Sequence, residues 1–375
     1  MPDISSEARE ILAMLKERHN VLLSGPPGTG KSRLLGEVAR AFLASQQAGP
    51  IHVPGAPVAI PKAPPVVATQ VMLPSAERTD RKIFRTVFHQ NSKHREFITG
   101  LVPVVGAGAQ GAPTFRVVTG TLYTASEHAK TSQGASLLII DEINRGPAVQ
   151  VFGGSIVAIE SDKRLAPNGQ PTTNTQVFEL MSPANGDLVE YSLPHHLYIL
   201  AAMNQADTSV EPLDVAFLRR WMPYHLEPNE SVLRNYFGLP ATAKGVLPAA
   251  PASAQDVFEA ATRAWVAINE RIRIGRGAEM QIGHGVLMGG AQVAQDLPGA
   301  LRDVVDSWKM LKAHVDEVFF GDTRSTAATL NIGIIEGHPL TLVDTTFGDE
   351  ARLELVGSGL PGVDSIYALL RAIAG

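Results

Sequence analysis

The sequence GPPGTGKS, residues 25–32, decides the fold of this 375-residue chain. It follows a short apolar run at residues 21–23 and opens a stretch whose apolar residues recur at helical spacing. A strand, a glycine-rich loop and a helix in this order form a cradle for phosphate, because glycine lets backbone N–H groups converge on oxygen atoms. The candidate phosphate-binding residues are Gly25, Pro26, Pro27, Gly28, Thr29, Gly30, Lys31 and Ser32. Lys31 would neutralise the terminal phosphates, and the Ser32 hydroxyl would bind Mg²⁺.

Three more apolar runs, at residues 85–89, 137–140 and 197–202, predict buried strands with polar residues after their carboxyl ends. Strands that alternate with helical patterns are typical of an α/β fold with a parallel sheet, whose ligands bind at the strand tips. Between residues 165 and 193, QVFEL and LVEYSL flank PANGD and predict a β-hairpin that projects from the sheet.

Polar residues follow two of these runs. Asp141 and Glu142 come directly after the run 137–140, and Asn204 follows the run 197–202. An acidic pair after a strand is more often a solvated strand end, but a phosphate cradle upstream favours a catalytic role. Asp141 would hold Mg²⁺ and Glu142 would polarise the attacking water. Asn204 would orient that water, although by itself it would be better explained as a turn cap.

Two arginines, Arg219 and Arg220, stand beside apolar Phe217 and Trp221. A planar guanidinium matches phosphate oxygens, and an arginine supplied by another subunit can raise the rate about a thousandfold or more. The pair cannot easily reach the loop at 25–32 of its own chain, so we expect it to act across a subunit interface. The competing interpretation is a solvated basic helix end.

Composition excludes several classes of function. With 37 acidic and 32 basic residues the net charge is −5, which disfavours unaided binding of nucleic acid. The chain has no cysteine, so disulfides, thiol catalysis and Cys–zinc sites are excluded. His89, His195 and His196 lack metal-ligand spacing and are expected to be structural. No apolar run reaches the roughly 18 residues of a membrane span, and the start lacks a signal-peptide core, so we expect a cytoplasmic protein without membrane contact.

Clusters of proline and glycine indicate the joints of the chain. We expect an α/β nucleotide-binding domain at 1–237 with a proline-rich insertion at about 44–76, and a linker at 238–254. Beyond it, apolar residues at helical spacing predict a small helical lid domain at 255–325. Residues 326–375 form a C-terminal extension of unknown role.

These motifs in this order resemble the AAA+ class of P-loop NTPases. Within that class they are similar to the McrB family, the nucleotide-hydrolysing motor subunits of modification-dependent restriction systems. The similarity to the family's DEINR, FGE and IExDKR segment lies in DEINRG (141–146), VFG (151–153) and IESDKR (159–164). The similarity to its TFHQ and YExFxxGxxP signatures lies in RTVFHQ (85–90) and FITGLVP (97–103). MNQAD (203–207), the segment 212–221, INERI (268–272) and IGH (282–284) resemble the family's MNTADRS, ALRRRF, NERI and IGHSYF motifs.

The resemblance covers about residues 10–325 and implies further roles. Asn144 would help to place the water and a neighbouring arginine, Arg145 would act near the nucleotide, and Asp207 belongs to the motif that contains Asn204. His284 would lie near the nucleotide base, with a packed lid histidine as an equal alternative. The residues that depart from the family pattern are Gly154, Thr208, Val210 and Trp221. They leave the nucleotide, ATP or GTP, open.

The family likeness implies a homo-oligomeric ring, a hexamer, with active sites between subunits. We expect a restriction or defence motor that couples hydrolysis to DNA translocation or to activation of a McrC-like nuclease. Only 24 residues precede Gly25. We therefore expect no DNA-reading domain before it, and contact with DNA through the partner. The alternatives are a MoxR-like ATPase that remodels protein complexes and a nucleotide-gated scaffold with little turnover. Hydrolysis stimulated by DNA would separate the first two.

Overall fold

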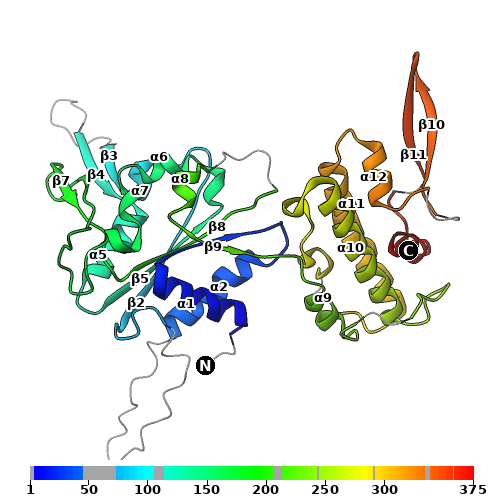
Figure 1. Cartoon of the computed structure of the whole chain (residues 1–375), viewed down its shortest axis with the longest axis horizontal. Coiled ribbons are helices and arrows are strands. Elements are labelled where there is room, and N and C mark those ends of the chain that lie inside the picture. Colours follow the sequence, from blue (N-terminus) through cyan, green and yellow to red (C-terminus); the bar gives the residue numbers. More distant parts are fainter. Residues whose placement is uncertain are drawn as a thin grey trace, which may run out of the picture. The chain divides into compact units, whose positions relative to one another are not determined.

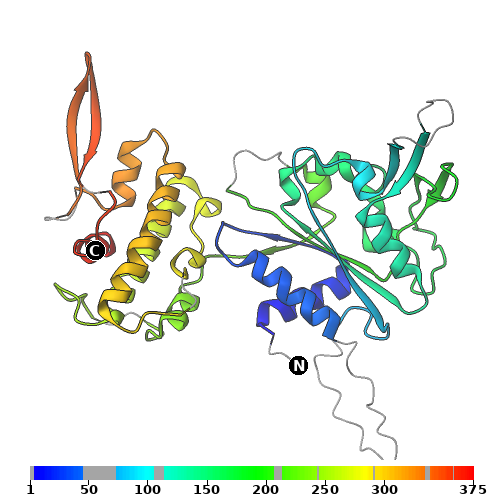
Figure 2. The same ribbon diagram turned by 180° about the vertical axis from the view of Figure 1, so that it is seen from behind.

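The computed structural model describes residues 4–44, 73–104, 114–206, 213–242, 245–289, 292–333, 338–357 and 359–375. Most of the expected insertion at 44–76 lies outside these residues. The chain divides into two compact units, the first made of residues 1–24 and 31–225 and the second of residues 25–30 and 226–375. Figures 1 and 2 show the helices and strands of both units.

A five-stranded parallel sheet forms the centre of the first unit. Its strands lie in the order β2-β5-β8-β1-β9. Their bounds are β1 (Asn20–Ser24), β2 (Asp80–Val87), β5 (Gly134–Asp141), β8 (Leu197–Ala202) and β9 (Met222–His225). Each neighbouring pair is parallel. After β1 the chain continues to β2 at one edge of the sheet, and after β8 it continues to β9 at the other edge. The neighbours β1 and β8 therefore define the switch point where ligands of open α/β sheets bind.

Helices cover both faces of this sheet (Figures 1 and 2). The helices α1 (Ser6–Arg18) and α2 (Lys31–Ala44) contact each other and the sheet. On the other face, Leu138 and Ile140 of β5 join a buried cluster with residues of α5 (Thr121–Lys130), α6 (Ala148–Phe152), α7 (Ser155–Ala158) and α8 (Val215–Leu218). Because alternate side chains of a strand point to opposite faces, strands that are buried along almost their whole length, such as β5 and β8, serve both layers.

Two β-hairpins extend from the layered core. The hairpin of β6 (Phe178–Met181) and β7 (Leu188–Tyr191) is antiparallel and confirms the hairpin predicted between residues 165 and 193. A second hairpin pairs β3 (Thr99–Val104) with β4 (Thr114–Thr119) after the short helix α4 (His94–Phe97). The α/β class with a parallel sheet and hairpin insertions is therefore confirmed.

The strand predicted at residues 85–89 is wrong in its limits and its burial. The strand β2 begins at Asp80 and ends at Val87, and most of its residues are only partly buried or exposed. Among the strands that the structure describes, it pairs with β5 alone and lies at one edge of the sheet. Edge strands tolerate charged residues, and its first half, DRKIF, therefore lacks the apolar run that marked the central strands.

Helices dominate the second unit. They are α9 (Glu230–Phe237), α10 (Ala254–Arg276), α11 (Leu297–Val318), α12 (Thr323–Thr329) and α13 (Ile366–Ala374). A single buried cluster joins them, and α13 packs directly on α10. An antiparallel hairpin of β10 (Thr341–Phe347) and β11 (Glu350–Val356) precedes α13. The C-terminal residues thus supply part of the core of this unit.

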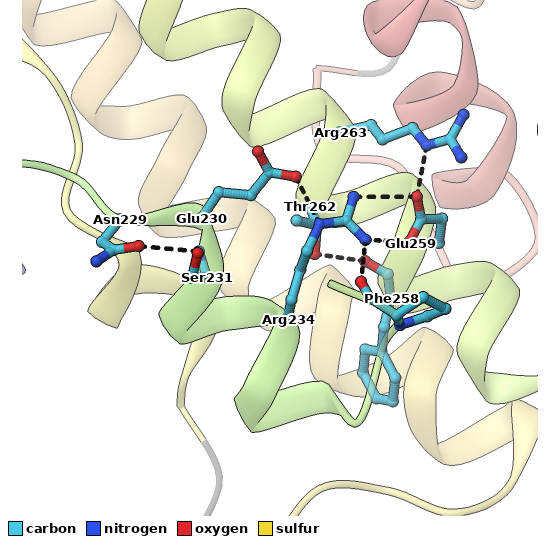
Figure 3. Close-up of polar contacts among 9 residues, drawn as sticks. Asn229, Glu230, Ser231, Arg234, Phe258, Glu259, Thr262 and Arg263 are labelled. Carbon is cyan, nitrogen blue, oxygen red and sulfur yellow. Dashed lines mark hydrogen bonds and ion pairs between the residues drawn. The ribbon is translucent and has the colours of Figure 1, made fainter. Parts of the chain in front are cut away.

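A network of charges ties α9 to α10 (Figure 3). Arg234 is 1% exposed, and its guanidinium contacts Glu230 at 2.6 Å and Glu259 at 3.0 Å. Arg263 contacts the same Glu259 at 2.6 Å. Burial acts to raise the pKa of Glu259, but hydrogen bonds from the two arginines outweigh it and hold that pKa below its usual value. Buried charges of this kind persist only when they are paired.

Among the helices of the described residues, none combines the length and the apolar character needed to cross a lipid bilayer.

Candidate functional site

The loop Gly25–Gly30 has the backbone of a phosphate cradle. Gly28 and Gly30 have φ values of 78° and 91°, a region that glycine enters without steric cost. Left-handed residues within a loop turn successive N–H groups toward one side and form an anion-binding concavity. The Thr29 hydroxyl donates to the Pro26 carbonyl at 2.9 Å and braces the turn. The loop therefore has a backbone that could hold a phosphate.

His284 lies beside this loop, in the same unit. The N–H groups of Gly283 and Gly285 donate to the carbonyls of Pro27 and Gly28 at 2.9 and 2.8 Å. A Cβ at Gly283 would lie 2.0 Å from the Gly28 carbonyl carbon, so only glycine fits there. The backbone N–H of Asn229 points to His284 Nδ1 at 3.4 Å. The predicted histidine is thus fixed next to the phosphate loop by backbone contacts on both sides of it.

In the first unit, two carboxylates stand at the carboxyl end of β5. Asp141 is its last residue, and Glu142 follows in a left-handed conformation with φ 52° and ψ 45°. The Glu142 N–H donates to Asp141 Oδ1 at 3.1 Å. A left-handed non-glycine residue costs about 1 kcal/mol or more, and such strain collects at functional sites. The structure therefore marks Glu142 independently of its sequence motif.

Two asparagines hold Glu142 in place. Asn204 Nδ2 donates to Glu142 Oε1 at 2.8 Å, and Asn144 Nδ2 donates to the Asn204 carbonyl at 2.8 Å. The second carboxylate oxygen, Oε2, lies 3.3 Å from Nε of Arg145. Asn204 follows β8, the neighbour of β5, so the sheet brings together residues that are 62 positions apart. The structure thus brings Glu142, Asn144, Arg145 and Asn204 together.

Lys31 and Ser32 begin α2. Lys31 is buried, with 9% of its surface exposed, whereas Ser32 is exposed. Burial lowers the pKa of Lys31 to about 8, and the negative charges of Glu142 and Asp141 limit the fall. A buried ammonium suits an anionic ligand, because phosphate oxygens would help to compensate its charge.

The two predicted arginines have different surroundings. Arg219 is exposed, whereas the Arg220 side chain is 7% exposed and its Nε lies 2.9 Å from Glu160. Arg220 also donates to the Ala216 carbonyl. An arginine held in this way is less available to a ligand than its neighbour.

Both arginines lie at the amino end of the sheet. Met222, which follows closely, pairs with Val21 near the start of β1, whereas Lys31, Glu142 and Asn204 follow the carboxyl ends. The five residues of β1 span about 13 Å at about 3.3 Å per residue. The arginine pair and the carboxylates are therefore not brought together within one chain.

Arg18 also lies near this pair. With them it lines a pocket of about 290 Å³ in the first unit. No local pattern marks Arg18 as functional, because a basic residue in the last turn of a helix is ordinary. Asp207 lies outside the residues that the structure describes.

Comparisons with known proteins agree with this geometry. Residues 69–221 match the family model of the AAA domain (dynein-related subfamily). The chain is similar to the type IV methyl-directed restriction enzyme EcoKMcrB subunit of Escherichia coli (strain K12), with 28% identity over 219 residues, 58% of this chain and 37% of the relative. It is also similar to the type II restriction enzyme BsuMI component YdiS of Bacillus subtilis (strain 168), with 38% identity over 92 residues, 24% of this chain and 26% of the relative.

These relatives are longer than the matched region, and the chain spans about a third of the first and about a quarter of the second. A solved structure from Cytophaga hutchinsonii covers 82% of this chain and 75% of its own, at 15% identity and a TM-score of 0.31, a likeness too low to decide anything about the fold. The sequence motifs, the parallel sheet and the matched domain point the same way. Residues 69–221 resemble an AAA domain of the dynein-related subfamily, and the chain is similar to an McrB subunit over 219 residues.

Proposed function

We propose that this protein binds ATP on the loop at residues 25–32 and hydrolyses it, as the motor of a multi-component restriction system. The observation that carries the proposal is the strained Glu142, whose carboxylate is held by Asn204 at the carboxyl end of adjacent parallel strands. A carboxylate held in this way suits the activation of water, because phosphoryl transfer depends on positioning and on charge.

Each residue has a part in the proposed reaction. The loop N–H groups and Lys31 would neutralise the phosphates. Glu142 would take a proton from water as the water oxygen bonds to the γ-phosphorus. The bond from that phosphorus to the bridging oxygen breaks, and ADP leaves with the electron pair. Asn204 would keep the carboxylate in line, and Arg145 would stay close to the nucleotide. GTP would fit the same phosphate contacts, with His284 near the base.

Magnesium fits the oxygen donors of the site. Ser32 offers a hydroxyl and Asp141 a carboxylate, both ligands that Mg²⁺ prefers. Within the described ranges, no group of three or more His, Cys, Asp or Glu residues could hold a metal by itself. This agrees with an ion that takes one or two protein ligands and completes its shell with phosphate and water. When bound, the ion would neutralise charge on the phosphates.

The position of the arginines supports catalysis in trans. Because the arginine pair lies at the amino end of the sheet, its exposed member, Arg219, would act on a nucleotide held by a neighbouring copy. A closed ring, a hexamer, would give every nucleotide site such a neighbour. The relatives are a subunit and a component of restriction enzymes, which favours an effector chain such as a McrC-like nuclease, with DNA contacted through that partner.

The test is a turnover assay with Glu142→Gln. Glutamine keeps the size and the hydrogen bond from Asn204 but removes the base, so turnover should fall by about a hundredfold or more while nucleotide still binds. Glu179→Gln, an exposed carboxylate of β6, is the matched control and should keep wild-type turnover. Full activity of Glu142→Gln would contradict the assigned role.

The same assay, run with ATP and with GTP and with or without DNA, tests the biological role. Stimulation by DNA in the presence of the partner supports the restriction motor. Hydrolysis that ignores DNA but responds to a protein substrate would instead support the MoxR-like alternative.

A further inference from the structure

The hairpin of β10 and β11 leaves one of its edges unpaired. It extends from the helices of the second unit, and β11 packs against α12 (Figures 1 and 2). Among the strands that the structure describes, β10 pairs with β11 alone, so its outer edge has no partner strand there. Two strands by themselves are only marginally stable in water, and an exposed edge is a template for a strand of another chain.

The exposed side chains of this hairpin are apolar and acidic. Phe347 is 78% exposed and Val343 is 37% exposed. Asp344 is also exposed and forms no ion pair with any residue that the structure describes. The hairpin carries four acids, at positions 344, 349, 350 and 354, and one base, Arg352, which pairs with Glu350 at 2.5 Å. Such a surface repels nucleic-acid phosphate and a second hairpin of the same kind, whereas it attracts a basic strand.

A basic strand edge of similar length occurs in the first unit. The edge strand β2 spans eight residues, against seven for β10. Its side chains Lys82 and Arg85 are exposed, and Val87 at its end is 58% exposed. Lys82 lies 3.9 Å from Asp80, whereas Arg85 forms no ion pair within the described part of the chain. The β2 edge therefore complements the hairpin in charge and offers it an apolar contact.

One register brings two complementary pairs of side chains together. Asp344 and Phe347 are three residues apart, and the same interval separates Lys82 from Arg85. A parallel pairing that sets Asp344 opposite Lys82 therefore also sets Phe347 opposite Arg85. The first pair joins opposite charges, and the second places a guanidinium beside an aromatic ring. Parallel addition also continues the direction of the neighbouring strands β2 and β5.

We infer that β10 of one copy adds to the β2 edge of a second copy as a parallel strand, in the register that sets Asp344 opposite Lys82. The two surfaces differ, so each copy can donate its hairpin to one neighbour and accept a hairpin from another. A contact of this kind repeats around a ring or along a filament. The inference goes beyond the proposed hydrolysis, because the contact needs neither nucleotide nor turnover.

The register can be tested with single cysteines, because the chain has none of its own. Thr341 and Thr79 each lie three residues before the paired positions 344 and 82, so the register sets these two exposed residues opposite each other. Neighbouring strands lie about 4.8 Å apart, within the reach of a disulfide. A Thr341→Cys chain mixed with a Thr79→Cys chain should therefore form a disulfide-linked dimer of the two different chains on mild oxidation. Mass spectrometry of the joined peptides identifies this product.

Thr346→Cys is the matched control, since it substitutes another exposed threonine of β10. The register sets Thr346 opposite Phe84, about 17 Å along the strand from Thr79. Its disulfide with Thr79→Cys should be at least about tenfold less abundant than that of Thr341→Cys. Each chain carries a single cysteine, so pairing within one chain cannot give the product. Equal yields for the two hairpin positions, or no dimer of unlike chains from either, would overturn the inference.

Charge reversal tests the same contact without a cross-link. Asp344→Lys should weaken the self-association of the nucleotide-free protein at least about fivefold in sedimentation velocity, and Lys82→Asp should do the same. The chain with both substitutions should recover most of the lost affinity, because opposite charges again face each other. Glu190→Lys, on the exposed hairpin of β6 and β7, is the control and should associate like wild type. All three positions are exposed, so the melting temperature should stay unchanged.

The outcomes separate this inference from the proposed function. If the chain forms the cross-link between positions 79 and 341 but hydrolyses no ATP, the inference stands and the proposed hydrolysis fails. If Asp344→Lys and Lys82→Asp both weaken association but the double variant recovers nothing, the two charges do not face each other and the inference is wrong. It is also wrong if Asp344→Lys keeps wild-type self-association and loses only the binding of a basic effector chain.

Discussion

Glu142 shows how one residue links backbone strain to chemistry. It occupies a left-handed conformation that glycine adopts freely, yet the position carries the carboxylate that Asn204 holds at 2.8 Å. A glycine here would relieve the strain and remove the candidate base. The strain is offset by the surrounding sheet, whose neighbouring strands β5 and β8 fix both ends of the hydrogen bond.

At the same scale, Lys31 predicts a pH dependence of nucleotide binding. Burial lowers the pKa of its ammonium to about 8, so the free protein loses this charge above that pH. If the charged form alone binds phosphate well, the affinity for ATP should fall by up to about tenfold per pH unit above pH 8. Equilibrium binding of a fluorescent ATP analogue between pH 6.5 and 9.5 would measure it.

Lys31→Arg is the control for this prediction, because a guanidinium stays charged throughout the range. Its affinity should be nearly independent of pH even if it is weaker overall. The effect on stability has the opposite sign. The folded protein holds the Lys31 proton more weakly than the unfolded chain does, so stability without nucleotide should rise with pH between about 8 and 10.5. Equal pH slopes for wild type and Lys31→Arg would contradict the prediction.

At the scale of elements, helix α13 forms part of the buried core of the second unit. Its residues Ile366, Leu369, Leu370 and Ile373 are buried, and it packs along α10 at the opposite end of the unit's sequence. Arg271 of α10 donates to the Ile373 carbonyl at 3.1 Å and so caps the end of this helix. The C-terminal helix therefore belongs to the folded core and is more than an appendage to it.

Leu370→Ala and Arg371→Ala form a matched pair of neighbours on α13, one buried and one exposed. Leu370→Ala should lower the free energy of unfolding by about 2–4 kcal/mol, because it leaves a cavity against the core. Arg371→Ala should change it by no more than about 0.5 kcal/mol. Equal effects would show that α13 is not part of the cooperative core.

Urea unfolding followed by tryptophan fluorescence can isolate this unit. The chain has 3 tryptophans, of which Trp265 and Trp308 lie in the second unit and Trp221 in the first. In a Trp221→Phe background, the fluorescence change therefore reports on the second unit. A shift of the midpoint at constant slope would identify a change in stability.

For the whole molecule, the arginines lie apart from the carboxylates, so the proposed catalysis in trans would require assembly. One copy holds the loop and Glu142, and a second would supply Arg219. We predict that Glu142→Gln with ATP sediments as a closed assembly of about 240 kDa, six times the 40.0 kDa of one chain, as a hexameric ring requires.

Sedimentation velocity with and without ATP measures this mass. Lys31→Ala, which lacks the phosphate contact, should stay at the mass of the nucleotide-free protein under both conditions. An ATP-loaded Glu142→Gln protein that remains monomeric would contradict catalysis in trans at the scale of the whole molecule.

The local part of the site was predictable because its signals are contiguous. The loop at 25–32, the strands β1 and β8 and the carboxylates after β5 each depend on short-range patterns of glycine, apolar residues and charge. The order of the strands and the contact of Asn204 with Glu142 are compatible with the motifs. The motifs alone do not give the distance between these side chains. The predicted strand at 85–89 begins after the true start of edge strand β2 at Asp80, because partial exposure removes the apolar signal from the first half of the strand.

By itself, the sequence determined the α/β class, the phosphate loop and the residue types that serve it, since these follow from local spacing. Only the tertiary structure distinguished Arg219 from Arg220, because the pairing of Arg220 with Glu160 joins segments 60 residues apart. It likewise brought Arg18 to the same pocket and α13 onto α10. Contacts between distant segments depend on how packed layers meet, and no local pattern of residues records that.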